Sequence, residues 1–144
     1  MKRLVTIIGI IALLTTSAFA VEWTTANQST VGWDAVTQNV DGEPFPEGDT
    51  IEYDVFLVKE SSTDRNADKI KKGTTADLQY VFTFDQEGRW LAGLQAVRTP
   101  AASPEDIKRS AIIWSDSIDV TFVPVPFGFI YFANPADPGG FGPK

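Results

Sequence analysis

The chain has 144 residues, a formal net charge of −7, and neither cysteine nor histidine. Without these two residue types it can form no disulfide, no thiolate or histidine metal site, and no Ser-His-Asp or Cys-His catalytic group. Because an acidic surface repels phosphate backbones and anionic lipid headgroups, the composition also argues against binding to nucleic acid or to a membrane surface. The length predicts one domain, and nothing in the composition indicates a cofactor.

The first twenty residues have the pattern of a cleavable secretory signal peptide. Lys2 and Arg3 precede an apolar run from Leu4 to Leu14, and the Ala-Phe-Ala step ending at Ala20 places small residues where signal peptidase cleaves. The run is well short of the roughly 20 apolar residues that span a bilayer, so we expect cleavage after Ala20 and no membrane insertion of the mature chain. An uncleaved helix at the membrane interface is the alternative. We therefore predict a secreted protein, periplasmic or extracellular, whose net charge is −9 once Lys2 and Arg3 are removed.

Apolar residues recur at every second position in several short segments, each bounded by Gly, Pro, Asp, Asn or Ser. Because successive side chains of a strand point to opposite faces of a sheet, this period indicates strands with one buried face. We predict an all-β fold of about seven antiparallel strands in two packed sheets over residues 21–123. Glu52 and Asp54 are expected to face solvent. A first strand is expected at Val21 to Thr25. In the strands that follow, the inward side chains are expected to be Val31 and Trp33; Ile51, Tyr53, Val55 and Leu57; Leu78, Tyr80, Phe82 and Phe84; Trp90, Ala92, Leu94 and Ala96; and Ile118, Val120 and Phe122.

Three polar segments separate these strands. Asp41 to Asp49 contains two prolines and two glycines and is expected to be a surface loop. Ser61 to Thr75 is expected to hold an edge strand or a single helical turn. Within Thr99 to Ser110, the stretch Ser103 to Asp106 has proline at a position that favours the start of a one-turn helix.

The order of the aromatic residues resembles the fibronectin type III family, in the form of a secreted bacterial single-domain member. Trp33 and Tyr53 stand where that family has a tryptophan and a tyrosine in its second and third strands, and Phe84 lies six residues before Trp90, which opens the sixth. Trp90, Ala92, Leu94 and Ala96 follow the family's step through core positions, and Trp114-Ser115-Asp116 is similar to its serine-rich turn near the last strand.

The resemblance covers Ser29 to Phe122 and implies an immunoglobulin-like sandwich that binds partners through the loops at one end or through a strand edge. The family usually has tyrosine at the position of Trp90, and its hydroxyl donates to the backbone of the preceding corner. The indole N–H of Trp90 is the donor that could replace it.

Two acidic segments are candidates for Ca²⁺. The first is the loop from Asp41 to Asp49 together with the start of the strand that follows it. Either a bound Ca²⁺ ion or simple solvation by water and salt would relieve the repulsion among its carboxylates. The second is Asp64, Asn66 and Asp68, which have the opening spacing of an EF-hand loop. Its continuation fails at Lys69 and Thr75, so side-chain capping of a turn is the simpler interpretation. The carboxylates of the first segment are Asp41, Glu43, Glu47, Asp49, Glu52 and Asp54.

Paired carboxylates can catalyse glycoside hydrolysis without histidine or cysteine. Such enzymes also need a deep aromatic cleft, and no carboxylate in this chain lies in an apolar run that would raise its pKa. We therefore predict that the protein is not an enzyme and has no catalytic residues, with a carbohydrate-active accessory domain as a weaker alternative.

The segment from residue 124 to 144 combines aromatic residues with five prolines. The prolines are expected to keep it out of the interior of a sheet, yet so many exposed aromatics would form a larger apolar patch than a soluble monomer usually carries. Two alternatives follow. Either the tail covers itself by folding along its own domain and extending the last strand through Gly128 to Phe132, or another subunit or a host structure covers it.

These observations together predict a secreted, non-enzymatic binding or structural module whose partner is a protein or a glycan. The loops expected to meet the partner are Asp41 to Asp49 and Thr99 to Arg109. The alternative is a self-assembling subunit of an extracellular or virion-like structure, a homo-oligomer formed through the tail. The candidate anchors are Trp23, Phe45, Phe127, Phe129, Tyr131 and Phe132, since aromatic residues contribute disproportionately at interfaces.

Overall fold

The computed structural model describes residues 20–117, 119, 123 and 125–133, which form nine strands and one short helix. The predicted all-β class is therefore confirmed. Almost all of the predicted signal peptide, the expected strand residues Ile118, Val120 and Phe122, and the tail from residue 134 onward lie outside the described residues. The described part contains no helix with the length and apolar character needed to cross a membrane.

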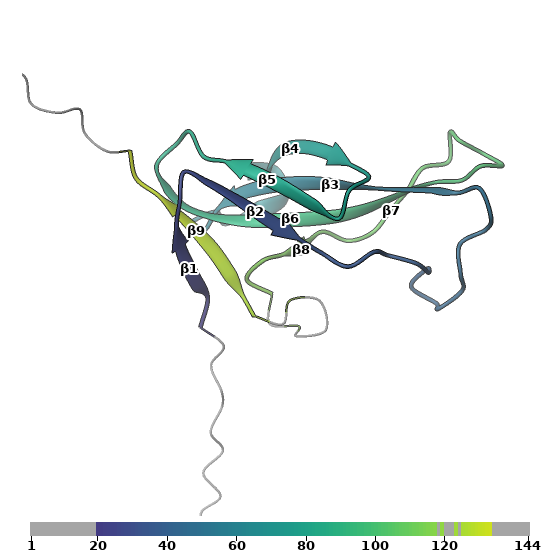
Figure 1. The fold of residues 1–144 in the computed structure, drawn as a ribbon, viewed down its shortest axis with the longest axis horizontal. Helices are drawn as coiled ribbons and strands as arrows, with labels where there is room; N and C mark the ends of the chain where they lie inside the picture. The colour runs from purple at the N-terminus through teal and green to yellow at the C-terminus, as the bar shows by residue number, and fades with distance from the viewer. Residues whose placement is uncertain (1–19, 118, 120–122, 124, 134–144) are drawn as a thin grey trace, which may run out of the picture.

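The strands form two sheets (Figure 1). The larger sheet has the order β1-β9-β6-β3-β4, with β7 and β8 also paired to β6, and the smaller sheet is the antiparallel pair β2 and β5. The strands are β1 (Glu22–Thr25), β2 (Gln28–Gly32), β3 (Thr50–Lys59), β4 (Ile70–Thr75), β5 (Gln79–Thr83), β6 (Gly88–Thr99), β7 (Lys108–Arg109), β8 (Ile113–Trp114) and β9 (Phe127–Tyr131).

The long strand β6 organises the larger sheet. Along one edge it pairs with β3 without interruption, from Thr50 opposite Thr99 to Lys59 opposite Trp90. Along the other edge three short strands follow one another, β9, β8 and β7. Ser115 lies where the pairing passes from β8 to β9, because its hydroxyl accepts the N–H of Ala92 and its carbonyl accepts the N–H of Phe127. Three short strands thus share this edge of β6.

The main core lies between the two sheets. Phe82 and Phe84 from the region of β5 pack against Phe129 of β9, with ring centroids 6.4 and 5.2 Å apart. Leu78 was predicted to join this core, but it is 44% exposed because it precedes β5 in a turn, where its carbonyl accepts the N–H of Trp33. The buried members are Val55, Leu57, Phe82, Phe84, Trp90, Ala92 and Phe129, and Val31, Trp33, Tyr80, Leu94, Phe127 and Tyr131 pack around them, as the alternation predicts for most of these residues.

The outer face of β3 is buried as well, so the prediction that Asp54 faces solvent is wrong. Asp54 is 4% exposed, and Phe56 and Val58 on the same face are also buried. Trp114 contributes to this second layer, because its ring occupies the space over Gly93, where an added Cβ would lie 2.6 Å from ring atom Cζ3.

Arg65 completes this outer layer. Its guanidinium lies 5.8 Å from the centre of the Trp114 ring and makes two hydrogen bonds of 2.7 and 2.8 Å to the carboxylate of Asp116. Arg65 begins the helix α1 (Arg65–Asp68), so the segment that precedes β4 is held against the larger sheet. Both structures proposed for Ser61 to Thr75 are present, a single helical turn followed by the edge strand β4. Ser103 to Asp106, in contrast, forms a hydrogen-bonded turn and no helix.

The indole of Trp90 donates to the carbonyl of Gln86 at 3.0 Å, in the turn that precedes β6. The indole N–H of Trp90 thus makes the bond to the preceding corner that a tyrosine hydroxyl makes in the fibronectin type III family. The buried ring is thereby fixed at the start of the longest strand, because a buried N–H without a partner would be costly.

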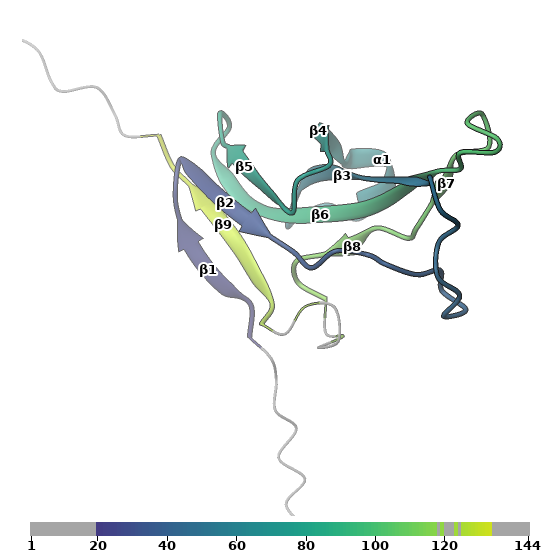
Figure 2. The ribbon, with the colours of Figure 1, turned by 45° about the vertical axis from the view of Figure 1, so that its right-hand side comes forward.

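The strand β9 lies inside the larger sheet, between β6 and β1 (Figure 2). Its pairing with β1 is parallel, from Glu22 opposite Phe127 to Thr25 opposite Ile130. Self-coverage is therefore what the structure shows for this part of the tail. The expectation that prolines keep it out of a sheet interior is wrong here, because Phe127 to Tyr131 contains no proline and can donate to both neighbours.

Candidate binding site

Two long loops leave the same end of the larger sheet. Residues 33–49 connect β2 to β3 and residues 100–107 connect β6 to β7. Because Thr50 at the start of β3 pairs with Thr99 at the end of β6, the two loops meet at this end of the sheet, and from there they diverge to opposite sides (Figures 1 and 2). We refer to them together as the loop surface.

Arg98 joins the two loops. Its Nη1 atom donates to Asn39 Oδ1 at 2.6 Å, and its guanidinium lies 5.5 Å from the centre of the Phe45 ring. The carboxylate of Asp49 accepts the N–H of Ala101 at 3.0 Å, and its second oxygen lies 3.3 Å from Arg98 Nε without hydrogen-bond alignment, so charge attraction holds that contact. A partly buried cation and a buried carboxylate thus fix both loops to the sheet.

The start of the first loop is held by the core. Trp33 follows β2 and packs at 5.4 Å from the ring of Tyr53, whose hydroxyl accepts the N–H of Val36 at 2.9 Å. Within the loop, Gln38 and Pro44 form an isolated bridge, and Gly42 has a φ of 86°, a left-handed conformation that glycine adopts without steric cost. The loop is thus anchored at both ends and in the middle.

Three apolar side chains project from the loop surface, Val36, Val40 and Ile107, and Val40 is fully exposed. The same two loops carry exposed carboxylates. Apolar residues at the centre and polar residues at the rim are typical of protein interfaces. The exposed carboxylates of the loops are Asp34, Asp41, Glu43, Glu47, Glu105 and Asp106.

Two of the six carboxylates in the acidic segment are already neutralised by basic residues distant in the chain. Asp49 is paired with Arg98, and Asp54 accepts from Lys71 at 2.7 Å and from Arg109 at 3.2 Å. Burial by itself raises the pKa of Asp54, but the hydrogen bonds from Lys71 and Thr74 and the two positive charges outweigh burial and lower that pKa. The repulsion that suggested Ca²⁺ is thereby reduced.

The EF-hand-like residues act in local capping. Asp64 caps α1 by accepting the N–H of Ala67 at 3.1 Å, and Asp68 accepts from the hydroxyl of Ser62 at 2.8 Å. Asn66 offers its backbone carbonyl to Lys69. Among the described residues no cluster of three acidic side chains has the arrangement of a metal site.

The six aromatic residues predicted as anchors have different positions. Phe129 is 4% exposed and lies in the core, so it presents no surface to a partner in this fold. Phe127 and Tyr131 are half-buried around the same core, and Phe45 is half-buried beneath Arg98. Trp23 is half-buried on the surface of the larger sheet, where its ring lies over Gly128 and beneath the guanidinium of Arg89. Phe132 follows β9 and is exposed.

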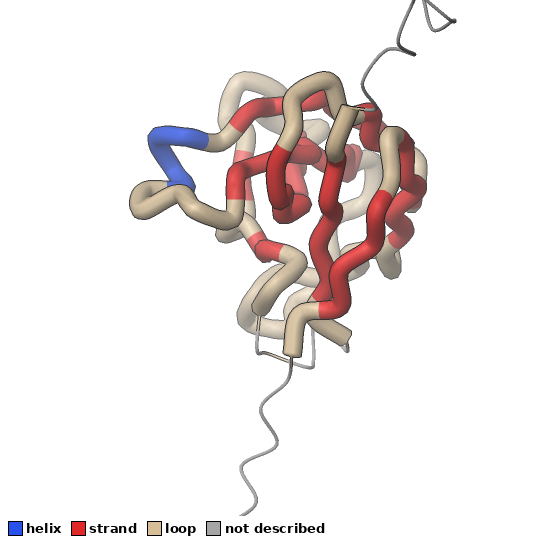
Figure 3. Tube along the Cα trace, turned by 90° about the vertical axis from the view of Figure 1, so that its left-hand side faces the viewer, coloured by secondary structure: helices blue, strands red, loops and turns tan. Residues whose placement is uncertain are grey.

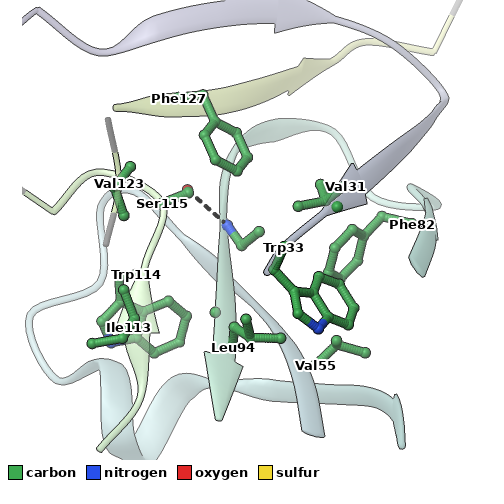
Figure 4. A pocket seen from close by; sticks show the side chains of 13 residues that line it. Val31, Trp33, Val55, Phe82, Leu94, Ile113, Trp114, Ser115, Val123 and Phe127 are labelled. Atoms are coloured by element: carbon green, nitrogen blue, oxygen red, sulfur yellow. Dashed lines mark hydrogen bonds between the residues drawn. The ribbon is translucent and has the colours of Figure 1, made fainter. Parts of the chain in front are cut away.

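An apolar cavity of about 90 Å³ opens beside β2 (Figure 4). Side chains from both sheets line it, with Val31 and Trp33 on one side and Ile113 and Phe127 on the other. Of the residues of the loop surface, only Trp33, at its base, lines the cavity.

Sequence reasoning missed the residues that organise the loop surface. Val36, Val40 and Ile107 are isolated apolar residues within polar loops, which is the signal that could have found them. Arg98 gave no such signal, because it continues a strand and its partner Asn39 is 59 positions away.

No protein-family model matches the chain, and neither a curated protein nor a solved structure matches it. The interpretation of the site therefore depends on its geometry.

Proposed function

We propose that the protein is a secreted fibronectin type III-like module that binds a partner through the loop surface and performs no chemistry. The fold part of the proposal is supported by the two facing sheets, by the contact of Trp33 with Tyr53, and by the bond from Trp90 to the corner before its strand. These are the positions that carried the resemblance in the sequence.

The observation that carries the binding proposal is the clamp around Arg98. A loop of seventeen residues would lose considerable conformational entropy if it became ordered only on binding. Arg98, Asp49 and Asn39 fix the backbone of residues 33–49 before any partner arrives. The exposed side chains of Val36 and Val40 are thus presented on a preorganised loop.

The partner is inferred to be a protein or a glycan with a neutral or basic surface. The exposed carboxylates of the loop surface repel anionic partners and attract cationic ones over about one Debye length, roughly 8 Å at physiological salt. The apolar side chains then supply the part of the contact that excludes water.

Affinity capture tests the binding proposal. The full chain is immobilised and exposed to the envelope and medium fractions of its host, in parallel with the variants Val40→Asp, Ile107→Asp and Val81→Asp. Val81 has an exposure similar to that of Ile107 but lies on β5, so it is the matched control. We expect a partner that the wild type and the Val81 variant retain and that both loop variants lose. Retention by both loop variants, or equal loss from the control, would contradict the proposal.

The secretion part is tested separately by mass spectrometry of the protein recovered from the periplasm and the medium. We expect a mass that corresponds to loss of residues 1–20. Recovery of the intact chain from the cytoplasm alone would refute secretion and leave the binding proposal standing.

A further inference from the structure

One edge of β2 has no strand beside it in the described part of the chain. The bonds from Phe84 N–H to Asn27 and from Trp33 N–H to Leu78 show which residues face β5. Since the backbone groups of an antiparallel strand alternate in direction, Ser29 and Val31 bond to β5. The N–H and C=O groups of Gln28, Thr30 and Gly32 therefore point away from β5.

The cavity lies along this edge. Val31 on β2, Phe127 on β9 and Ile113 on β8 line it, and the smaller sheet, which has only two strands, leaves them partly uncovered (Figure 4). A strand placed beside β2 would direct every second side chain toward these three residues, because side chains of neighbouring strands share a face. The free backbone groups and the apolar cavity thus belong to one site.

On the larger sheet the outer strands β4 and β1 carry features that block strand addition, and β2 does not. The outer edge of β5 also lacks charge and proline, but the cavity is lined by Val31, Gly32 and Trp33 and by Phe82 alone from β5, which distinguishes the edge of β2. The outer strand β4 contains Lys71 and Lys72, and its pairing with β3 has a register shift between Val55 and Phe56. The outer strand β1 has only four residues and contains Glu22. Lysines, short length and irregular pairing are the means by which proteins protect an edge, whereas β2 has five residues without charge or proline.

The topology favours one extended segment over a second folded copy. The larger sheet continues past β2, because β9 and β1 lie beyond it on the side away from β5 (Figure 2). A second copy paired through its own β2 would bring its own β9 and β1 into the same space. A single strand needs only the width of one strand, about 4.8 Å.

The charge around the site favours a basic segment. Glu22 lies opposite Phe127, on the side of β1 that faces the cavity, and Asp34 follows the other end of β2. Both residues are exposed, and within the described residues neither is paired with a cation.

We propose that the free edge of β2 binds an extended polypeptide segment that pairs with Gln28, Thr30 and Gly32 and places apolar side chains in the cavity beside Val31. Lysine or arginine residues that flank the segment meet Glu22 and Asp34. This inference deepens the proposed function by assigning a second surface and a partner chemistry to the same non-covalent module, and it requires only the fold to be correct.

A designed peptide tests the proposal. The probe is a capped peptide of about nine residues, a usual strand length, in which valine alternates with threonine and a lysine stands at each end. Binding to the full chain is measured by isothermal titration at low salt. We expect saturable binding that weakens about tenfold when glutamate replaces both terminal lysines. Absence of binding, or equal affinity for the two peptides, would overturn the proposal.

The matched variants are Thr30→Pro and Thr30→Ala. Proline removes the N–H that points to the free edge without removing a bond to β5, whereas alanine removes the same side chain and keeps the N–H. We expect Thr30→Ala to bind as the wild type does and Thr30→Pro to lose about tenfold in affinity, the loss of one hydrogen bond. Equal binding by the two variants contradicts strand pairing.

A measurement on the unaltered protein covers the case in which Thr30→Pro does not fold. Only every second residue of the bound peptide would direct its N–H toward β2. N-methylation of these amides blocks the pairing, whereas N-methylation of the alternate amides leaves it intact. We expect only one of the two methylated peptides to bind. A dimer of the full chain without peptide, dissociated by Thr30→Pro, would assign the edge to a second copy and overturn the proposal. The variant Val40→Asp should bind the probe normally, so failure of the loop surface and failure of this site are distinguishable.

Discussion

Asp54→Asn removes one negative charge from the buried outer face of the larger sheet and leaves the shape of the side chain almost unchanged. The carboxylate side chain is 6% exposed and accepts from Lys71, Arg109 and the hydroxyl of Thr74. An asparagine can offer only one oxygen to these three donors, and its NH₂ group would face a cation. The variant therefore tests whether the ion cluster stabilises the fold.

The expected cost follows from the exposure of the partners. Breaking a fully buried ion pair costs about 3–5 kcal/mol because the remaining charge is left without water. Lys71 and Arg109 are 49% and 48% exposed, so both can regain water when Asp54 is replaced. The loss is then limited to the charge-assisted hydrogen bonds, and we expect the free energy of unfolding to fall by about 2 kcal/mol.

Urea unfolding at pH 7 measures this difference, with Asp77→Asn as the control. Asp77 is an exposed carboxylate, and its replacement should change the free energy of unfolding by less than about 0.5 kcal/mol. An Asp54 variant within that same margin of the wild type would refute the stabilising role of the cluster.

The pH dependence gives an independent result. The pKa of Asp54 is lowered in the folded protein from its ordinary value of 3.8, so the folded state holds the carboxylate in its charged form. A lowered pKa contributes stability that is present above the unfolded value and is lost as the pH falls through the folded value. The difference between wild type and Asp54→Asn should be constant above about pH 5 and should shrink below pH 3.8. A difference that persists unchanged into strong acid would show that charge is not its cause.

Three further substitutions test the packing and the clamp. Gly93→Ala should cost about 1–3 kcal/mol, because the new Cβ would lie 2.6 Å from the Trp114 ring; urea unfolding at an unchanged m value measures it. Trp90→Phe keeps an aromatic ring but loses the bond to Gln86, and its unfolding free energy should fall by about 1–3 kcal/mol; no loss would show that the bond contributes little. Arg98→Ala leaves a buried carboxylate without its cation, so a loss of about 2–4 kcal/mol is expected, with faster amide hydrogen exchange confined to residues 33–49 and 100–107; uniform exchange throughout would contradict the clamp.

The sequence predicted the strand interiors well but did not indicate that three short strands share one edge of β6. The alternation that placed Val55 and Leu57 inside is a local property, because it depends only on the direction of successive side chains. The arrangement of β8 and β9 along β6 depends on Ser115, which bonds to Ala92 on a distant strand. Local alternation carries no information about that bond.

The candidate site was predicted only in outline. The loop at Asp41 to Asp49 was recognised from its prolines and glycines, which prevent a continuous strand. The clamp was not recognised, since Arg98 meets its partners only when β6 has paired with β3. The open edge of β2 likewise becomes visible only when every other strand has been given its neighbours.

By itself, the sequence determined that this protein is built from strands and which side chains those strands turn inward, because both follow from the order of apolar and polar residues within a few positions. Only the tertiary structure decided which strands lie next to one another, which carboxylates meet a cation, and which edge is left open. Asp54 shows the reason: the sequence predicted a solvated carboxylate, and the fold buried it by bringing Lys71 and Arg109 from other strands to its side. Contacts of that kind are set by chain pairing over long separations, and no local pattern encodes them.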